Sequence, residues 1–406
     1  MTTRTEDLDT LLARIPDPAI RSLFTPEFVL CAEHFDRFTV DWVLRLVHNL
    51  ELDRPLASAG GVSAAELVRA RGFAPRAEIP LRWFLRKLAH SGYLDEVEES
   101  DESDESKPGA DPTYRARGPL PPGDPDRAEA SARAIDPGSL PAFAVVRAMV
   151  EHVPEFLRGE KTGEEILFSP ARLPLWFDYF SNDNLLYQIN NRLGAEAVAR
   201  ALPATPATVV ELGGGSGSAA MALAERLARD AALGRIERYR FTEIVPTFLR
   251  RAERTLRARF PELPLTFSRV DMDRSLEQQG IAPESADVVY AVNTVHIARD
   301  LDATLRQIRG VLRPGGAAVF SECVRPFPGQ PIYVEFVFNF LENFTGVATD
   351  PATRPNHGFL TPANWRDALA AAGFERPEIL PDVESLARHY DAFFVAAVTA
   401  WKPKGK

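Results

Sequence analysis

The sequence has few cysteines and no surplus of positive charge. Cys31 and Cys323 are its two cysteines among 406 residues, which excludes a fold held together by several disulfides. No apolar run is long enough to cross a bilayer, and the polar, acidic start does not resemble a secretory leader. The net charge of −10 argues against a nucleic-acid partner, since phosphate contacts need clustered Lys and Arg. No His, Cys or Asp grouping has metal-ligand spacing. These absences predict a cytoplasmic protein without a membrane, nucleic-acid or metal partner.

The length of the chain predicts two or three domains, and residues 1–120 have the pattern of the first. Apolar residues recur at helical spacing over 34–52, and a short helix starts at Ser63. A third helix over 79–94 stops near Gly92, and extended patterns follow on both sides of an acidic run at 95–107. Two helices followed by a hairpin predict a winged-helix-like domain, whose acidic tip has too little apolar surface to be ordered.

After this region, Pro, Gly and Asp over 118–140 indicate a linker, and residues 121–200 are predicted to be a linker followed by a helical lid. From 201 to 406, strand and helix patterns alternate, as in a doubly wound α/β sheet. The predicted strands lie at 208–212, 239–244, 265–270, 286–291, 316–321 and 393–401.

The most informative motif is the run Thr-Val-Val-Glu-Leu-Gly-Gly-Gly-Ser-Gly at 208–217. A buried strand there leads to Glu211, and glycines follow at Gly213, Gly215 and Gly217 before a helical pattern begins. Glycine allows positive φ and lets the backbone pass close to a ligand. The run therefore predicts a nucleotide-like ligand at the end of the first strand.

Acidic and polar side chains follow the next strands, where ligands bind in such sheets. Glu243 is placed to accept hydrogen bonds from a ribose diol, and Asp271 and Met272 suit an adenine amino group and ring. Asn293 follows the fourth strand. An ionised Glu211 would repel a pyrophosphate but attract an amino group. S-adenosylmethionine has an adenosine and an amino group but no phosphate, so it is the predicted cofactor.

With these residues identified, 208–322 resembles a class I S-adenosylmethionine-dependent methyltransferase. The run from Glu211 to Gly217 matches the first motif of that family, and Leu-Arg-Pro-Gly-Gly at 312–316 matches the later turn before strand five. The resemblance implies a mainly parallel Rossmann-like sheet with an antiparallel last strand. Two branches with an added N-terminal region are similar: small-molecule O-methyltransferases, whose N-terminal domain dimerises, and the C-methyltransferase domains of polyketide synthases. They imply a homodimer acting in secondary metabolism on a small, largely apolar or carrier-bound acyl substrate.

His296 is the predicted catalytic base, because imidazole titrates near neutral pH and this residue follows the fourth strand. Glu322 ends the neighbouring strand, where its carboxylate can orient the imidazole and raise its basicity. By resemblance the pair is the His-Glu dyad of polyketide C-methyltransferases. O-methyltransferases use a similarly placed His within a His-Asp-Trp run, which this sequence lacks. Carbon and oxygen both stay open as acceptors, with carbon favoured.

Aromatic residues before and after the sheet suggest either core packing or an apolar substrate pocket. The candidates for substrate contact are Trp176, Tyr187, Tyr333, Phe336 and Phe340. The loop Asn-His-Gly at 356–358 offers either a second substrate contact or a plain surface turn, and the surface turn is favoured.

Two hypotheses of other classes remain. A winged-helix regulator would use Arg82, Arg86 and Lys87 to read DNA, which the overall acidity disfavours. A non-catalytic partner would have a disrupted glycine loop or would lack a base. This sequence has both an intact glycine loop and a candidate base.

Overall fold

The computed structural model describes residues 8–97 and 112–405, which form two compact units. The sheet unit consists of residues 8–29, 177–328 and 346–405, and the helical unit consists of residues 30–176 and 329–345. The division differs from the predicted boundaries near 120 and 200, because residues 8–29 pack in the sheet unit. There Phe24 lies 4.6 Å from Phe393, ring centre to ring centre, and the Tyr390 hydroxyl donates to the Val29 carbonyl.

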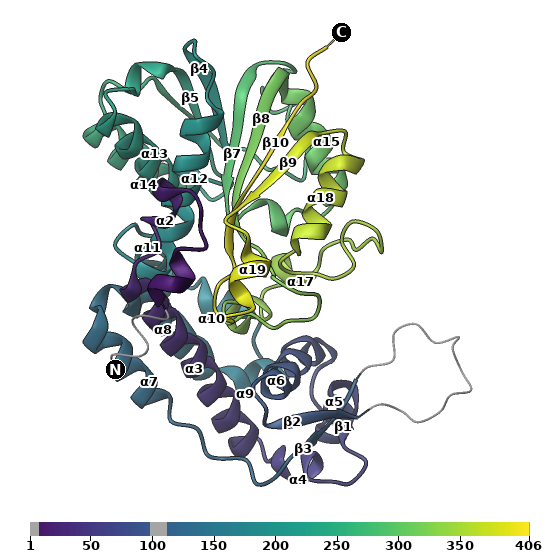
Figure 1. Cartoon of the computed structure of the whole chain (residues 1–406). Coiled ribbons are helices and arrows are strands. Elements are labelled where there is room, and N and C mark those ends of the chain that lie inside the picture. Colours follow the sequence, from purple (N-terminus) through teal and green to yellow (C-terminus); the bar gives the residue numbers. More distant parts are fainter. Residues whose placement is uncertain (1–7, 98–111, 406) are drawn as a thin grey trace. The chain divides into compact units, whose positions relative to one another are not determined.

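A seven-stranded sheet is the centre of the sheet unit, with strand order β6-β5-β4-β7-β8-β10-β9 (Figure 1). Its strands are β4 (Ala207–Leu212), β5 (Ile236–Thr242), β6 (Leu265–Ser268), β7 (Ala286–Val292), β8 (Leu312–Cys323), β9 (Glu375–Leu380) and β10 (Val395–Trp401). The pairs among β6, β5, β4, β7 and β8 are parallel, and β10 is antiparallel to both of its neighbours. The predicted α/β class, with an antiparallel last strand, is confirmed.

Some strands have a clearer apolar pattern in the sequence than others. All six residues of β4 are buried, as expected for a strand covered by helices on both faces. Strand β9 was not predicted. It lies at the sheet edge, carries Pro377 and has no buried residue, so its pattern lacks the apolar signal of a central strand.

Helices cover both faces of the sheet (Figure 1). The helices of the sheet unit include α2 (Pro18–Arg21), α12 (Leu185–Ala201), α13 (Ser218–Arg229), α14 (Pro246–Arg259), α15 (Leu301–Val311), α18 (Pro362–Ala371) and α19 (Val383–Ala387). Helix α12 packs against α13 and strands β7, β8 and β10, while α15 and α18 lie on the other face. Residues 185–201, which the sequence assigned to a lid, are therefore part of the core of this unit.

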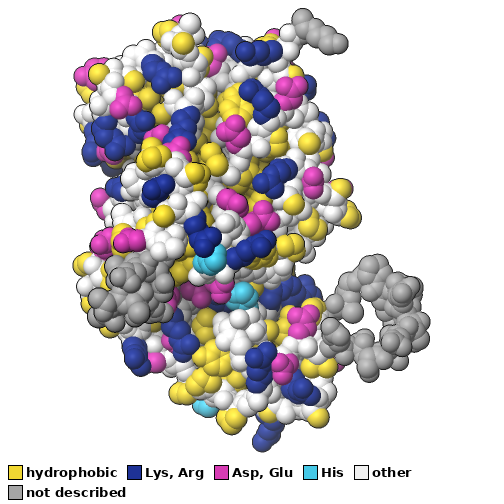
Figure 2. All heavy atoms as spheres, in the orientation of Figure 1, with side chains coloured by type: hydrophobic (Ala, Val, Ile, Leu, Met, Phe, Trp, Pro, Cys, Tyr) yellow, Lys and Arg dark blue, Asp and Glu magenta, His cyan; other side chains and the backbone are white. Residues whose placement is uncertain are grey.

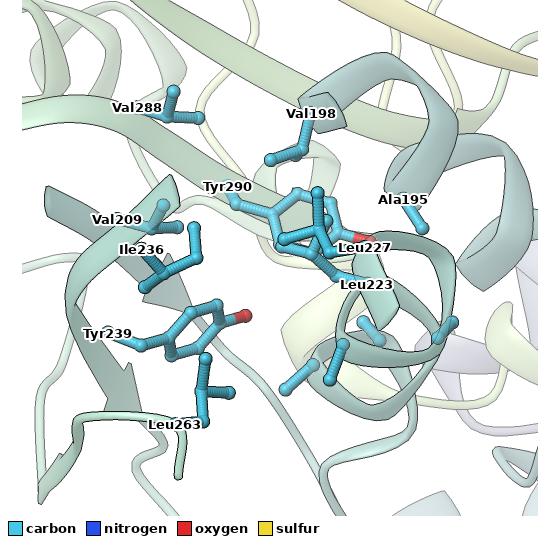
Figure 3. Close-up of a cluster of buried hydrophobic side chains, with 14 of the residues drawn as sticks. Ala195, Val198, Val209, Leu223, Leu227, Ile236, Tyr239, Leu263, Val288 and Tyr290 are labelled. Atoms are coloured by element: carbon cyan, nitrogen blue, oxygen red, sulfur yellow. The ribbon is translucent and has the colours of Figure 1, made fainter. Parts of the chain in front are cut away.

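The core beneath α12 and α13 is a cluster of aliphatic side chains around two tyrosines (Figure 3). Val198 of α12 and Leu223 and Leu227 of α13 meet Tyr239 of β5 and Tyr290 of β7 there. Each is at most 1% exposed. Burial of side chains of this size contributes about 1.5–3 kcal/mol each, so this packing fixes the strand ends that carry the polar residues of the site.

The helical unit combines many short helices with a three-stranded antiparallel sheet of order β1-β3-β2. Its main elements are α4 (Asp53–Leu56), β1 (Val62–Ser63), α5 (Ala64–Arg71), α6 (Glu78–His90), β2 (Leu94–Val97), β3 (Thr113–Ala116), α7 (Pro125–Ile135), α8 (Leu140–Val150), α9 (Val153–Leu157), α10 (Gly163–Leu167), α16 (Glu335–Phe338) and α17 (Glu342–Thr345). Helix α3 (Pro26–Asn49) enters this unit, and α11 (Leu173–Tyr179) leaves it.

The N-terminal part of the helical unit follows the predicted order of helices and hairpin. Ser63 begins α5 with a capping box to Glu66, as the sequence predicts. Of the predicted acidic loop at 95–107, residues 95–97 belong to β2, and the remainder lies outside the described residues. The winged-helix assignment and the homodimer stay predictions.

The predicted linker at 118–140 contains helix α7 instead. Asp124 accepts a hydrogen bond from the Arg127 amide, and Pro125 occupies the first turn. Asp and Pro were interpreted as linker residues, yet at these positions they are helix-start residues. The prediction of a linker was wrong for residues 125–135.

The surface shown in Figure 2 carries Lys and Arg interspersed with Asp and Glu. Among the described helices, none is both long and apolar enough to cross a membrane. Within residues 8–97 and 112–405, no group of three or more His, Cys, Asp and Glu side chains is arranged to hold a metal ion.

Candidate active site

The glycine turn after β4 is shaped by close contacts on one side and open space on the other. Gly213 and Gly215 have φ of +60° and +57°, which disfavours any residue with a Cβ. A Cβ on Gly214 would lie 2.3 Å from the Phe241 ring, whereas a Cβ on Gly215 would meet no atom within 4 Å among the described residues. Gly217 precedes α13 as its N-cap. A side chain at position 215 would fill the open side, where a ligand could approach the backbone.

Glu211 is buried at the end of β4 and is 1% exposed. Its Oε2 accepts a hydrogen bond of 2.7 Å from the Tyr239 hydroxyl, while its Oε1 has no partner among the described residues. Burial raises the pKa of Glu211 to about 8, and the nearby charge of Glu243 adds to this rise. From the sequence, Glu211 is expected to be ionised. That assumption is corrected, because a buried carboxyl with this pKa is mostly protonated at neutral pH until a cation binds.

Glu243 follows β5 and lies against the glycine turn. Its Oε2 accepts from the Gly215 amide at 2.8 Å, and its Oε1 accepts from the Val245 amide at 2.7 Å. Burial raises the pKa of Glu243, and these backbone hydrogen bonds oppose the rise. Each carboxylate oxygen can accept more than one hydrogen bond, so both keep capacity for a ligand hydroxyl.

Asp271 and Met272 follow β6, and Asn293 follows β7. Asp271 is partly buried, and its Oδ1 accepts from the Asp273 amide at 3.0 Å. Asn293 has a φ of +46° and accepts a 2.9 Å hydrogen bond from the Cys323 amide. Asn293 thus joins the ends of β7 and β8. Its predicted contact with a cofactor stays a prediction.

His296 and Glu322 are paired as the sequence predicts. His296 lies in the short turn η5 (Val295–Ile297) after β7, and its Nδ1 is 2.6 Å from Oε2 of Glu322 on β8. The other oxygen of Glu322 accepts from the amides of Thr294 and Val295, at 3.2 and 3.0 Å. His296 is 4% exposed and Glu322 is fully buried. Because its carboxylate receives donors on both oxygens, Glu322 is well placed to accept the Nδ1 proton of His296.

Two side chains next to this pair were not predicted from the sequence. Thr294 donates to the carbonyls of Gly213 and Val292, so it links the glycine turn to the His296 turn. The Phe359 ring lies 4.5 Å from the His296 imidazole, centre to centre. Phe359 comes one residue after the 356–358 loop that was interpreted as a surface turn. Gly358 and Phe359 are buried, and no periodic pattern in that loop marks them.

Tyr187 of α12 lies close to these residues. Burial raises the pKa of the Tyr187 hydroxyl, and a hydrogen bond with the Asn293 side chain opposes that rise. The ring packs against Tyr179 and Phe180, at 5.4 and 5.1 Å between centres. The structure therefore brings Tyr187 to the strand ends that carry His296 and Glu322, and contact with a substrate stays a prediction.

The other predicted substrate residues lie in the helical unit and pack in its core. Trp176 donates to the Leu167 carbonyl at 2.8 Å and stacks on Phe168. Tyr333, Phe336 and Phe340 are at most 3% exposed. Their ring partners within this unit are Phe35, Trp83, Phe84 and Phe156. These contacts are those of core residues, and a substrate role for the four stays a prediction.

The residues of this strand-end site fit S-adenosylmethionine. The open side of Gly215 leaves room beside the backbone, and Glu243 supplies oxygen acceptors for hydroxyl groups. The unpartnered Oε1 of Glu211 is a buried acceptor that an amino group would satisfy. An adenosine and an amino group match these features.

Comparisons with known proteins identify a methyltransferase domain within the sheet unit. Residues 210–318 match a sequence model described as a methyltransferase domain. The chain is 30% identical over 234 residues to the highly reducing polyketide synthase frbB of Dothideomycetidae sp. (strain 11243), covering 58% of this chain but 8% of that synthase. The chain thus spans less than a tenth of this relative.

Solved structures share the whole fold. The CurJ carbon methyltransferase superposes with a TM-score of 0.74 and 18% identity, covering 98% of each chain. CalH, a trans-methyltransferase in complex with SAH, superposes with a TM-score of 0.59 and 19% identity, covering 91% of this chain and 90% of that one.

The sheet order and the glycine turn are those of the class I S-adenosylmethionine-dependent methyltransferase fold, and residues 210–318 match a methyltransferase domain. The chain is similar in sequence to part of a polyketide synthase and in fold to a carbon methyltransferase. These comparisons give no support to the hypothesis of a winged-helix regulator.

Proposed function

We propose that the chain methylates a carbon atom next to a carbonyl group, on a small, largely apolar acyl chain carried as a thioester. The observation that carries this proposal is the buried His296–Glu322 pair, with 2.6 Å between Nδ1 and Oε2. Carbon acids of this kind need a base that is oriented and kept from bulk water. Support for a polyketide-type substrate comes from the synthase that the chain resembles.

His296 and Glu322 have different roles in proton transfer. Glu322 accepts the Nδ1 proton of His296, which leaves the lone pair of the imidazole on Nε2. The C–H bond of the substrate breaks, its proton goes to Nε2, and its electron pair is delocalised into the neighbouring carbonyl. Glu322 then stabilises the imidazolium that forms. The amides of Thr294 and Val295 hold the carboxylate in place during this step.

The donor would be held by Glu211, the glycine turn, Glu243, Asp271 and Met272. When bound, S-adenosylmethionine would supply an electrophilic methyl group for the deprotonated carbon, and its S–CH3 bond would break to release S-adenosylhomocysteine. Glu211 pairs with an amino group, and Glu243 accepts from hydroxyl groups while its own position is fixed by Gly215 and Val245. Because these acids stand on rigid strand ends, positioning supplies much of the rate enhancement.

The test is methyl transfer from labelled S-adenosylmethionine to three acceptors. A β-ketoacyl thioester has an acidic α-hydrogen, its α,α-dimethyl analogue has none, and a simple phenol offers only oxygen. We expect the wild type to methylate the first alone. Methylation of the phenol alone would establish the alternative, an O-methyltransferase. Absence of donor binding by calorimetry would refute the methyltransferase proposal.

Variants then test the roles of the pair. We expect His296→Asn and Glu322→Gln to bind the donor normally and to lower kcat by roughly 10²–10⁴-fold. His389→Asn is the matched control, because His389 is an exposed histidine of the same unit. Equal rates for wild type and His296→Asn would exclude His296 as the base.

A further inference from the structure

The turn that carries His296 is also held by an arginine from a distant loop. Arg354 lies in the segment that precedes α18, where its backbone pairs with Asp350 through two hydrogen bonds of 2.8 Å. Its Nη1 donates to the Ala298 carbonyl at 2.6 Å, and its Nη2 donates to the carbonyl of His296 itself. The Ala348 amide also donates to the Arg299 carbonyl, at 2.8 Å. The loop therefore holds the backbone on both sides of Ile297.

The guanidinium of Arg354 is buried at unusual cost. The residue is 2% exposed, and no carboxylate among the described residues lies within the 4.0 Å of an ion pair. Its Nε has no hydrogen-bond partner in that same part of the chain. Burial lowers the pKa of Arg354 to about 10, and the more distant charges of Asp273, Asp300 and Glu322 oppose this effect. An apolar side chain of similar volume would avoid this penalty.

We propose that Arg354 is a positioning residue that fixes the His296 turn through its two carbonyl bonds. This inference rests on the proposed role of His296 as the base. Glu322 at Nδ1, the Phe359 ring at 4.5 Å and Arg354 at the backbone carbonyl then all help to determine the place of the imidazole. The planar guanidinium can span two carbonyl oxygens at once, which an ammonium group does less well.

The test compares Arg354→Met and Arg354→Lys with a matched control. Arg235 also holds backbone carbonyls, those of Ala199 and Leu202, in the same unit but away from the His296 turn. Methyl transfer to the β-ketoacyl thioester gives kcat and KM, and calorimetry gives the Kd of S-adenosylmethionine. A misplacement of the base by about 1 Å can cost about 10²-fold in rate.

We expect Arg354→Met to lower kcat by at least about tenfold while the donor Kd changes by less than about twofold. Arg354→Lys, which keeps the positive charge, should recover part of that loss. Arg235→Met should leave kcat unchanged even if it lowers the Tm. Wild-type kcat in Arg354→Lys and Arg354→Met would overturn the proposal. If Arg354→Met does not fold, a wild-type kcat in Arg354→Lys alone overturns it.

A second readout does not depend on turnover. In nitrogen-labelled protein, the proton shared by His296 Nδ1 and Glu322 should give a downfield NMR signal, assigned by its loss in His296→Asn. We expect this signal to shift or broaden in both Arg354 variants and to stay in place in Arg235→Met. An unchanged signal in the Arg354 variants overturns the positioning role. If instead the wild type methylates no acceptor, the proposed function fails, and the signal still tests Arg354.

Discussion

Gly213 lies so close to Thr294 that a Cβ at position 213 would be 2.4 Å from the threonine Cγ2. Thr294 in turn donates to the Gly213 carbonyl at 3.3 Å. The turn predicted to hold the donor and the turn that carries the base are therefore in direct contact.

This contact makes Gly213→Ala a test of the donor site. The added Cβ meets Thr294, and the φ of +60° is strained for alanine, at a cost of about 1–3 kcal/mol. We expect the Kd of S-adenosylmethionine to rise by roughly tenfold in calorimetric titration. Gly234→Ala is the control, because a Cβ there meets nothing within 4 Å among the described residues. Equal donor affinity in Gly213→Ala and Gly234→Ala would contradict the predicted role of the turn.

Glu211 predicts a pH dependence of donor binding. Its pKa of about 8 means that the carboxyl must lose a proton before it can pair with an amino group. Affinity should therefore tighten as the pH rises from about 6 toward 8, by up to about tenfold per pH unit, and weaken again above about pH 8, where the α-amino group of the donor loses its own proton. Glu211→Gln should bind more weakly and show a flat profile over this range. A wild-type profile as flat as that of the variant would rule out this linkage.

The same carboxyl predicts a pH effect on stability. The folded-state pKa of about 8 lies above the ordinary value of 4.5, so the folded chain keeps a proton that the unfolded chain releases. The resulting loss in the free energy of unfolding is absent below pH 4.5 and grows by about 1.4 kcal/mol per pH unit up to pH 8. We expect Glu211→Gln to gain stability relative to wild type over this window, measured by urea unfolding. A difference between the two proteins that does not change with pH would contradict the raised pKa.

Two helical glycines should respond in opposite ways to alanine. A Cβ at Gly194 of α12 would lie 2.6 Å from the Tyr290 hydroxyl, whereas one at Gly310 of α15 meets nothing within 4 Å among the described residues. Alanine is favoured over glycine in a helix by about 1 kcal/mol. We expect Gly310→Ala to raise the free energy of unfolding and Gly194→Ala to lower it, because overpacking costs about 1–3 kcal/mol. A higher free energy of unfolding in Gly194→Ala would contradict this prediction, because it would mean that Tyr290 can move away from the added Cβ.

Much of the sheet unit could be predicted because its signals are local. The glycine turn, Glu243 and Asp271 each follow a strand that is apolar enough to be found. Parallel strands bring their carboxyl ends to one edge, so His296 and Glu322 could be paired across 26 residues.

The remaining features depend on contacts that no local pattern records. Arg354 and Phe359 reach the His296 turn from a loop more than fifty residues later, and neither lies on a periodic element. The protonation of Glu211 follows from its burial rather than from its residue type. Strand β9 lies at an edge and lacks an apolar face.

The chain enters the helical unit twice and returns to the sheet unit each time, and this route affects how the protein can fold. The helical unit needs residues 329–345, which are made only after most of the sheet unit. Strand β10 fits between β8 and β9 although it comes last in the chain. Neither unit can reach its final packing early in synthesis, and a single cut in the gene will not yield two independent folding units. A split protein or a transplanted domain must therefore keep all four crossings between the units intact.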